Sequence, residues 1–204
     1  MAPDNETTWL AQALDGDDEA FAHIVETYQR PVFSVCYRML GNAGDAEDAA
    51  QESFLRAYKN LYRYDPNRSF ATWLLSIASH YCIDQLRKRR LTTFSIDDDD
   101  NWWQPPDPGP SPENVLAGTE RRAKVVELLD TLKHQDRAVV VLHYWHDYSY
   151  EEIAETLELS VSAVKSRLYR ARRTLAKGWQ EKEHQEKALE SKNAERVPYE
   201  TQAF

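Results

Sequence analysis

The sequence predicts an all-α fold of two small helical domains joined by a flexible, acidic, proline-rich linker. Between Thr7 and Arg90 there are only three glycines and two prolines, and apolar residues recur at three- and four-residue spacing, which is typical of a helical bundle. The stretch from Ser95 to Asn114 contains five prolines and an acidic run, so it cannot hold a regular helix or a central strand. Helical periodicity returns from about Glu113 to Lys177.

These shifts in composition divide the chain into five segments. We expect an N-terminal segment, a first helical domain, a linker, a second helical domain and a polar tail, at residues 1–18, 19–91, 92–118, 119–178 and 179–204. The tail has mixed charge and almost no large apolar residues, so we expect a frayed helix or no regular structure there.

Composition argues against a membrane or disulfide-stabilised protein. The longest apolar run, AVVVLHYW, is too short to span a bilayer, and the N-terminus lacks the basic start and apolar block of a signal peptide. We therefore expect a cytoplasmic protein without membrane insertion. Cys36 and Cys82 are far apart and lie among apolar residues, which predicts buried thiols.

The sequence contains no constellation that predicts an enzyme. His134, His143 and His146 have no nearby cysteine and no H-E-x-x-H motif, so we expect no metal site. A nucleophile with a plausible base and a glycine-rich phosphate loop are both missing. We therefore expect no catalytic residues and no cofactor.

Within the first domain, the stretch GDAEDAAQESFLRAYKNLY predicts a helix that begins near Asp45, whose side chain can cap it. We expect this helix to pack through small and large residues, namely Ala46, Ala49, Ala50, Leu55 and Tyr58. Acid and amide groups project near one side of the first half, at Asp45, Glu47, Asp48, Gln51 and Glu52. Taken alone, these acids equally fit the ordinary enrichment that the helix dipole favours at an N-terminus.

The following stretch, YDPNRSFATWLLSIASHYCIDQLRKRR, predicts a loop at Asp65–Ser69 and then a helix. The expected buried face of this helix consists of Phe70, Trp73, Leu74, Ile77, Ala78 and Tyr81. For Trp73 we favour the core over a role as a stacking platform. A basic cluster ends the helix at Arg87, Lys88, Arg89 and Arg90, which suits backbone phosphates but also complements the helix dipole.

Two features of the linker, an acidic run and a pair of tryptophans, bear on whether it contacts a partner or stays in solvent. Asp97–Asp100 has the charge pattern of a phosphate chain, although an acidic linker that stays solvated explains it equally well. The adjacent Trp102 and Trp103 predict docking onto a partner surface, because exposed neighbouring tryptophans are unusual in a solvated linker.

The second domain contains a helix-turn-helix pattern. SYEEIAETLEL predicts a short helix with Ser149 as its cap and Glu152 at the capping-box position. After a turn around Glu158 to Ser160, the stretch Val161–Lys177 carries six basic side chains and no acid, within a chain of net charge −9. A helix that lies in the major groove sits between two rows of phosphates, where a carboxylate would be repelled.

A helical wheel divides the Val161–Lys177 stretch into two faces. The stripe expected to face the core consists of Val161, Val164, Leu168, Ala171 and Leu175. The opposite face carries Ser162, Lys165, Ser166, Tyr169, Arg170 and Arg173, with Arg167 and Arg172 on the flanks of the stripe. A basic helix that merely faces solvent remains an alternative. Glu158 is a departure from the pattern, because the turn often needs left-handed dihedrals, which cost about 1 kcal/mol for such a residue.

Taken in order from residue 19 to 177, these motifs resemble the extracytoplasmic-function sigma factors of bacterial RNA polymerase, the group 4 members of the sigma-70 family. The specific parts are GDAEDAAQESFLRAY, FATWLLSIA and VKSRLYRARRTL. The resemblance implies that the first domain is sigma region 2, which binds core polymerase and recognises the minus-ten element. It implies that the second domain is sigma region 4, whose helix-turn-helix recognises the minus-thirty-five element.

The resemblance also implies roles for named residues. The acidic set Asp45, Glu47, Asp48, Gln51 and Glu52 would dock on the clamp coiled coil of the largest polymerase subunit. The minus-ten set would be Asn67, Arg68, Ser69, Phe70, Arg87, Lys88, Arg89 and Arg90, with a base of the melted nontemplate strand turned into a pocket. The minus-thirty-five set in duplex DNA would be Ser162, Lys165, Ser166, Arg167, Tyr169, Arg170, Arg172 and Arg173.

The expected function is therefore that of a sigma factor that directs promoter-specific transcription initiation in a stress or envelope response, with an anti-sigma factor as a further expected partner. The alternative is a stand-alone helix-turn-helix regulator that binds duplex DNA as a dimer without entering polymerase.

Overall fold

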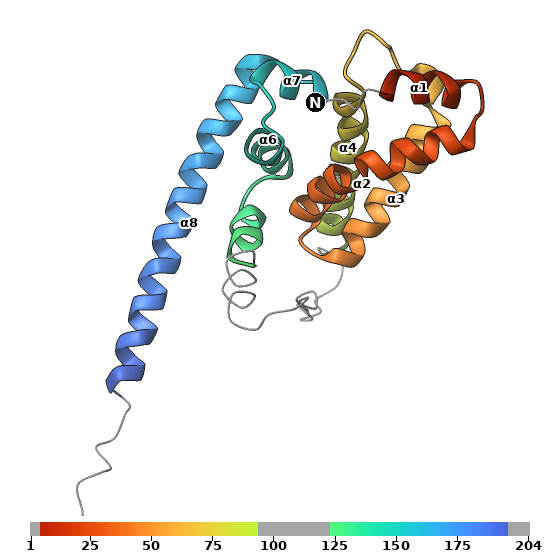
Figure 1. Ribbon diagram of the computed structural model, residues 1–204. Coiled ribbons are helices and arrows are strands. Elements are labelled where there is room, and N and C mark those ends of the chain that lie inside the picture. The colour runs from red at the N-terminus through yellow and green to blue at the C-terminus, as the bar shows by residue number, and fades with distance from the viewer. Residues whose placement is uncertain (1–4, 94–122, 196–204) are drawn as a thin grey trace, which may run out of the picture.

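The computed structural model describes residues 5–93 and 123–195, with side chains described for residues 5–89 and 123–184. The linker expectations at Asp97–Asp100, Trp102 and Trp103 fall outside these ranges. Every regular element within them is helical, which confirms the all-α prediction. Figure 1 shows an N-terminal lobe and a C-terminal lobe, with the long last helix at the edge of the molecule.

The N-terminal lobe is a bundle organised around one long helix. Its elements are α1 (Glu6–Leu14), α2 (Asp18–Leu40), α3 (Ala43–Lys59), the 3-10 turn η1 (Leu61–Arg63) and α4 (Phe70–Thr93). Helix α2 packs against α1, α3 and α4. Gly41 ends α2 in the left-handed conformation, with φ 87° and its N–H donating to the Tyr37 carbonyl, so the chain reverses and α3 begins at once.

The buried face of α4 lies where the sequence predicts it. Phe70, Leu74 and Ala78 are fully buried, and Trp73, Ile77 and Tyr81 are partly buried against them. Cys36 and Cys82 are buried free thiols, as expected.

The sequence-based account of α3 needs two corrections. Asn42, rather than Asp45, caps the helix, because its side-chain oxygen accepts the Asp45 N–H at 2.8 Å. Leu55 and Tyr58 do not pack inside but are 52% and 43% exposed, and Phe54 and Ala57 are buried in their place. At 3.6 residues per turn Leu55 lies about 180° from the buried Ala46, so one face cannot hold both.

The C-terminal lobe consists of helical residues 123–130 followed by α6 (His134–Trp145), α7 (Tyr150–Thr156) and α8 (Val161–Glu195). The predicted capping box is present, since Ser149 Oγ accepts the Glu152 N–H and the Glu152 carboxylate accepts the Ser149 N–H. Ser160 Oγ accepts the Ala163 N–H at 3.2 Å and so caps α8. The expected stripe on α8 is buried at Val164, Leu168 and Ala171 and partly buried at its two ends.

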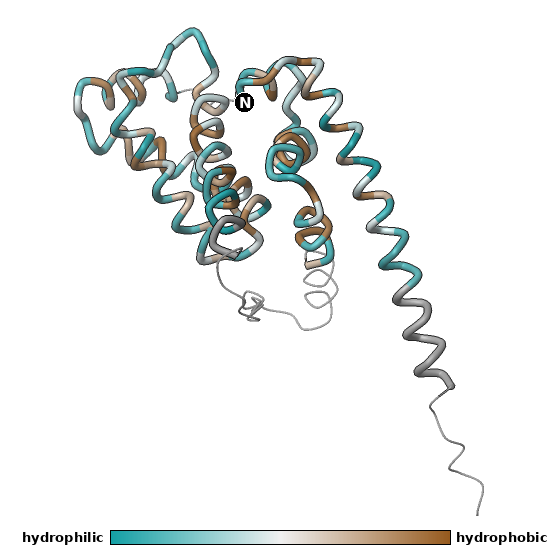
Figure 2. Tube along the Cα trace, turned by 180° about the vertical axis from the view of Figure 1, so that it is seen from behind, coloured by the Kyte–Doolittle hydropathy of each residue, from teal (hydrophilic) through white to brown (hydrophobic). Residues whose placement is uncertain are grey.

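Helix α8 continues well beyond the stripe, to Glu195. The segment after residue 178, for which we expected a frayed helix or no regular structure, is thus helical as far as the structure describes it. Gly178 packs close to Leu128, and Lys182 pairs with Glu127, so α8 lies beside the helix at 123–130. Figure 2 shows that much of α8 is hydrophilic, whereas hydrophobic segments gather where α2, α4 and α6 meet.

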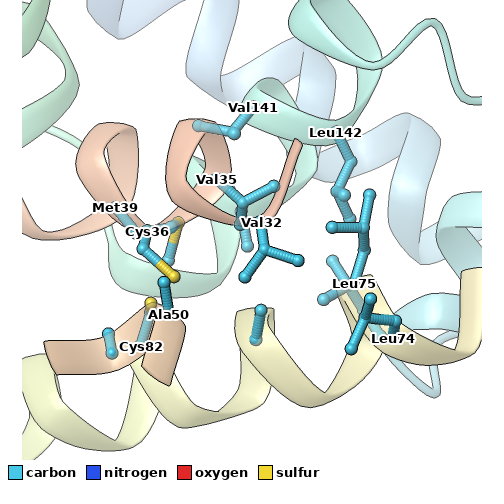
Figure 3. Close-up of a cluster of buried hydrophobic side chains, with 14 of the residues drawn as sticks. Val32, Val35, Cys36, Met39, Ala50, Leu74, Leu75, Cys82, Val141 and Leu142 are labelled. Atoms are coloured by element: carbon cyan, nitrogen blue, oxygen red, sulfur yellow. The ribbon is translucent and has the colours of Figure 1, made fainter. Parts of the chain in front are cut away.

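The two lobes share a hydrophobic core, which the sequence did not predict. Helix α6 packs against both α2 and α4, and α7 packs against α4. Figure 3 shows Val141 and Leu142 of α6 beside Val32 and Val35 of α2 and Leu74 and Leu75 of α4. Burial of these aliphatic side chains stabilises the packing of the two lobes against each other.

A buried arginine adds a polar contact between the lobes. The side chain of Arg137 in α6 is 3% exposed, and its Nε donates to the Arg38 carbonyl near the end of α2 at 2.6 Å. The same guanidinium pairs with Asp130. The carbonyl groups of the last helical turn have no partner within their own helix, so Arg137 satisfies one of them from the other lobe.

Candidate nucleic-acid interfaces

The first half of α8 presents one exposed polar face above its buried stripe. Tyr169 is 63% exposed, and the other exposed residues of this face are Ser162, Lys165, Ser166, Arg170, Arg172 and Arg173. Helix α7 precedes it after a short turn between Thr156 and Val161, and both helices pack on α6 and on each other. The structure therefore brings together seven of the eight residues predicted for duplex DNA on the solvent side of one helix.

The turn between α7 and α8 contains a left-handed residue, as helix-turn-helix turns often do. Glu158 has φ 54°, the Leu159 N–H donates to the Ala154 carbonyl at 2.8 Å, and the Glu158 N–H donates to the Glu155 carbonyl at 3.4 Å. These two bonds form the Schellman motif that ends a helix. Glutamate takes the position that usually holds glycine, so the turn retains some backbone strain.

The basic residues of this face differ in how firmly the protein holds them. Arg172 Nε donates to Tyr144 Oη at 2.8 Å, which raises the pKa of Arg172. Lys165 and Arg173 lie over the rings of Tyr150 and Tyr169, each at 5.9 Å from the ring centroid. These contacts orient the cations without burying them.

Arg167, the eighth residue of the predicted set, has a different environment. Its side chain is half-buried and donates to Asp136 Oδ1 at 2.8 Å and to Gln135 Oε1 at 2.5 Å. It therefore fastens α8 to the start of α6. Because its guanidinium is already bonded within the protein, it is poorly placed to contact a base.

The loop predicted to read single-stranded DNA is held by its own side chains. Asp65 Oδ1 accepts bonds from the Asn67 backbone N–H at 3.0 Å and from Asn67 Nδ2 at 2.9 Å, and these bonds lower the pKa of Asp65. Tyr64 Oη donates to the Arg68 carbonyl at 2.6 Å. Asn67, Arg68 and Ser69 are all exposed.

Two residues of this set have contacts that bear on their predicted role. Phe70 is 1% exposed and makes ring contacts with Tyr28, Tyr64 and Trp73, so its ring belongs to the core and supports the loop from below. Arg68 Nη1 lies 3.2 Å from Glu155 Oε1 of α7 in the other lobe. Arg68 is therefore paired with a carboxylate of the other lobe.

The basic end of α4 lies next to the acidic start of α3. Arg89 pairs with Asp45, and Arg87 Nη1 lies 3.4 Å from Asp84 Oδ1. Hydrogen bonds from Asn42 and Arg89 lower the pKa of Asp45, although burial opposes them. The side chain of Arg90 lies outside the described residues. Two predicted sets, the docking acids and the basic cluster, therefore meet at the Asp45–Arg89 pair.

The remaining predicted docking residues lie on the outside of α3. Glu47, Asp48 and Gln51 are exposed, and Glu52 is half-buried, with an ion pair to Arg56 at 2.7 Å. Leu55, Tyr58 and Tyr62 continue this exposed surface toward η1. The sequence analysis had assigned Leu55 and Tyr58 to packing, although Leu55 falls opposite the alanine stripe on a helical wheel.

Comparison with known proteins identifies the family. Residues 24–92 match the family described as sigma-70 region 2, and residues 122–175 match sigma-70 region 4. The chain is 37% identical over 182 residues to the ECF RNA polymerase sigma factor SigW of Bacillus subtilis, covering 82% of this chain and 93% of the relative. It is 32% identical over 180 residues to the ECF RNA polymerase sigma factor SigE of Mycolicibacterium smegmatis, covering 86% and 69%.

The solved structure of CnrH in complex with the cytosolic domain of CnrY is also similar. It has a TM-score of 0.63 and 29% identity and covers 85% of this chain and 96% of that one. No helix among the described residues is long and apolar enough to cross a membrane. With regions 2 and 4 both present, the chain belongs to the sigma-70 family, as an extracytoplasmic-function sigma factor of RNA polymerase.

Proposed function

We propose that this sigma factor, which directs transcription initiation by RNA polymerase, docks on core polymerase through α3 and reads the promoter with two separate surfaces. The exposed face of α8 reads the minus-thirty-five duplex. The loop at residues 65–69 reads the minus-ten element as single strand.

The observation that carries this proposal is the exposed face of α8. From residue 161 to residue 177 the chain has no carboxylate, and its exposed polar groups are hydroxyl, ammonium, phenol and guanidinium. These groups donate to guanine edges and phosphates or contact a thymine methyl group. Arg170 and Tyr169 lie centrally and suit base edges, whereas Arg172, held by Tyr144 at the flank, suits a phosphate.

For the minus-ten element we propose a pocket formed by Asn67, Arg68 and Ser69. Amide, guanidinium and hydroxyl groups in an exposed loop suit the edge of an unstacked base. The buried Phe70 ring supports this loop and need not touch the base. Arg87, Lys88 and Arg89 at the end of α4 then contact backbone phosphates, with Arg90 as a further member of this cluster.

For core polymerase we propose the exposed surface of α3. Glu47, Asp48, Gln51 and Glu52 supply carboxylates and amides that form charge-assisted bonds with basic groups of the clamp coiled coil. Leu55 adds an apolar contact on the same helix. A stand-alone helix-turn-helix regulator is not favoured, because such a protein has no use for a complete region 2.

The docking test is a charge reversal on α3. The double variant Asp48→Lys, Glu52→Lys should lose association with core polymerase and run-off transcription, because two attractions become repulsions. The matched control is Asp15→Lys, Glu26→Lys, which makes the same charge change at exposed sites outside α3. Co-purification and circular dichroism measure binding and helical content. Association at the parental level by the α3 variant would contradict the assignment of α3.

The proposed partners and location follow from the same role. An anti-sigma factor is a proposed partner, since the related CnrH was solved with the cytosolic domain of CnrY. The chain would act in the cytoplasm, where promoter DNA and polymerase meet. It contributes recognition and has no catalysis of its own, because the polymerase performs the chemistry.

A further inference from the structure

Asp136 is a buried carboxylate behind the exposed face of α8. It is the third residue of α6, in the first turn, where the helix dipole favours an acid and where such acids are usually exposed to solvent. The residue is nevertheless only 4% exposed. Its Oδ1 accepts hydrogen bonds from two arginines of α8, Arg167 at 2.8 Å and Arg170 at 3.2 Å.

The two arginines use this carboxylate differently. Arg167 also donates to Gln135, and its Nε is buried, so little of its guanidinium is left for a ligand. The side chain of Arg170 is 53% exposed and uses only Nη2 in the contact with Asp136. A guanidinium has about five N–H donors in a fixed fork, so Arg170 is tethered at one nitrogen and still has donors for DNA.

We propose that Asp136 is a positioning residue that sets the base preference of Arg170 in the promoter duplex. This inference rests on the proposed role of α8 in reading the minus-thirty-five element. A free arginine side chain loses rotamer freedom when it binds, and a tether at one nitrogen removes part of that loss before DNA arrives. The tether also restricts the directions in which the remaining donors point.

The negative charge of Asp136 also favours contact of Arg170 with a base over contact with a phosphate. Asp136, Arg167 and Arg170 together carry one net positive charge, where the two arginines alone would carry two. Phosphate contacts raise affinity for every sequence, whereas a bidentate arginine contact to guanine favours one base. Asp136 therefore restrains Arg170 from swinging to a phosphate and favours its use on a base.

The test uses holoenzyme reconstituted from the full chain and core polymerase. The probe is a duplex library with a short randomised segment upstream of a fixed minus-ten region, selected by binding and sequenced. The variants are D136N, D136E, R170A and the double variant D136N/R170A. The matched control is E151Q, which removes one carboxylate charge from an exposed site in the first turn of α7.

For R170A we expect loss of base preference at one or two base pairs. D136N should lower the preference at those same base pairs by roughly three- to tenfold. D136N should also make the log–log salt dependence of binding to a scrambled duplex steeper by about one, because the released arginine reaches another phosphate. The double variant should show the base preferences of R170A, because Asp136 sets base preference through Arg170 and its bond to Arg167 only holds α8 on α6.

Several outcomes would overturn the inference. These are D136N behaving like the parent or like E151Q, or D136N altering base pairs that R170A leaves unchanged. Should D136N fail to fold in thermal unfolding, D136E decides: it keeps the charge and the salt dependence but displaces the acceptor, so a parental base preference in D136E rejects the role. If R170A itself leaves every preference intact, the proposed function of this face fails instead.

Discussion

The two surfaces proposed to read DNA are built in different ways. On α8, the exposed residues and the buried stripe belong to one helix, so burying Val164, Leu168 and Ala171 also orients the residues opposite them. The loop at residues 65–69 has no such periodic support. It depends on the Asp65–Asn67 bonds, on the Tyr64 hydroxyl and on Glu155 of the other lobe. A helix carries its own geometry, whereas this loop takes its geometry from tertiary contacts.

The largest expected effect comes from removing the support beneath the loop. Phe70→Ala should lower the free energy of unfolding by about 3–5 kcal/mol, because it leaves a cavity among Tyr28, Tyr64 and Trp73. Urea unfolding of the full chain measures this change. Tyr62→Ala, at a 68% exposed ring in the same lobe, is the control and should change stability little. A parental stability for Phe70→Ala would mean that the ring is not a core residue.

A smaller effect on the free energy of unfolding should come from His146, close to where the lobes meet, when the pH is lowered. Burial, and next the nearby charge of Arg38, lower the pKa of His146 to about 4, while Asp147 opposes this shift. The unfolded chain binds a proton near pH 6.5 and the folded protein does not. The contribution of His146 is therefore full above pH 6.5 and is lost as the pH falls toward 4, up to about 3 kcal/mol.

Urea unfolding between pH 7 and pH 4 tests the role of His146, because this range runs from above its ordinary pKa of about 6.5 down to its lowered pKa of about 4. His146→Gln should show a shallower loss of stability than the parent, because glutamine binds no proton in this pH range. Some loss should remain, because acids elsewhere titrate in both proteins. Equal pH dependence in the two proteins would show that His146 is not shielded where it faces Arg38.

On α8 the comparison predicts two different losses from two neighbouring arginines. Arg170→Ala should weaken binding of specific promoters by about 1–3 kcal/mol and relax discrimination, because it removes a base contact. Arg172→Ala should lower affinity for all sequences alike and reduce the salt slope by about one, because it removes a phosphate contact. Fluorescence anisotropy of holoenzyme on specific and scrambled duplexes separates the two. Equal losses on both duplexes for both variants would reject the assignment.

The smallest effect concerns the turn that precedes α8. Glu158→Gly should raise the free energy of unfolding by up to about 1 kcal/mol, because glycine adopts φ 54° without the steric cost of a side chain. Thermal unfolding measures this gain, and base preference should stay at the parental level. A loss of stability would show that Glu158 makes a compensating contact worth more than the strain.

Much of the helical content was predictable from short-range patterns. The capping box at Ser149 and the stripe on α8 depend on residues within a few positions of one another, and both are present. Local patterns also placed Phe70 on a buried face while the family resemblance placed it in a base pocket, and its 1% exposure supports the first. Leu55 shows the limit of this reasoning, because an apolar residue on a helix is not always in the core.

The sequence by itself determined that the chain is helical, which faces of its helices are apolar and where the basic and acidic groups concentrate, since these depend on helical periodicity and on local hydrogen bonds. Only the tertiary structure decided which charged and polar groups meet. Arg137 reaches the Arg38 carbonyl from 99 residues away, Arg68 meets Glu155, and Asp136 holds Arg167 and Arg170. Such pairings arise because the apolar faces of α2, α4 and α6 bury one another, and neighbouring polar groups must then find partners wherever that packing leaves them.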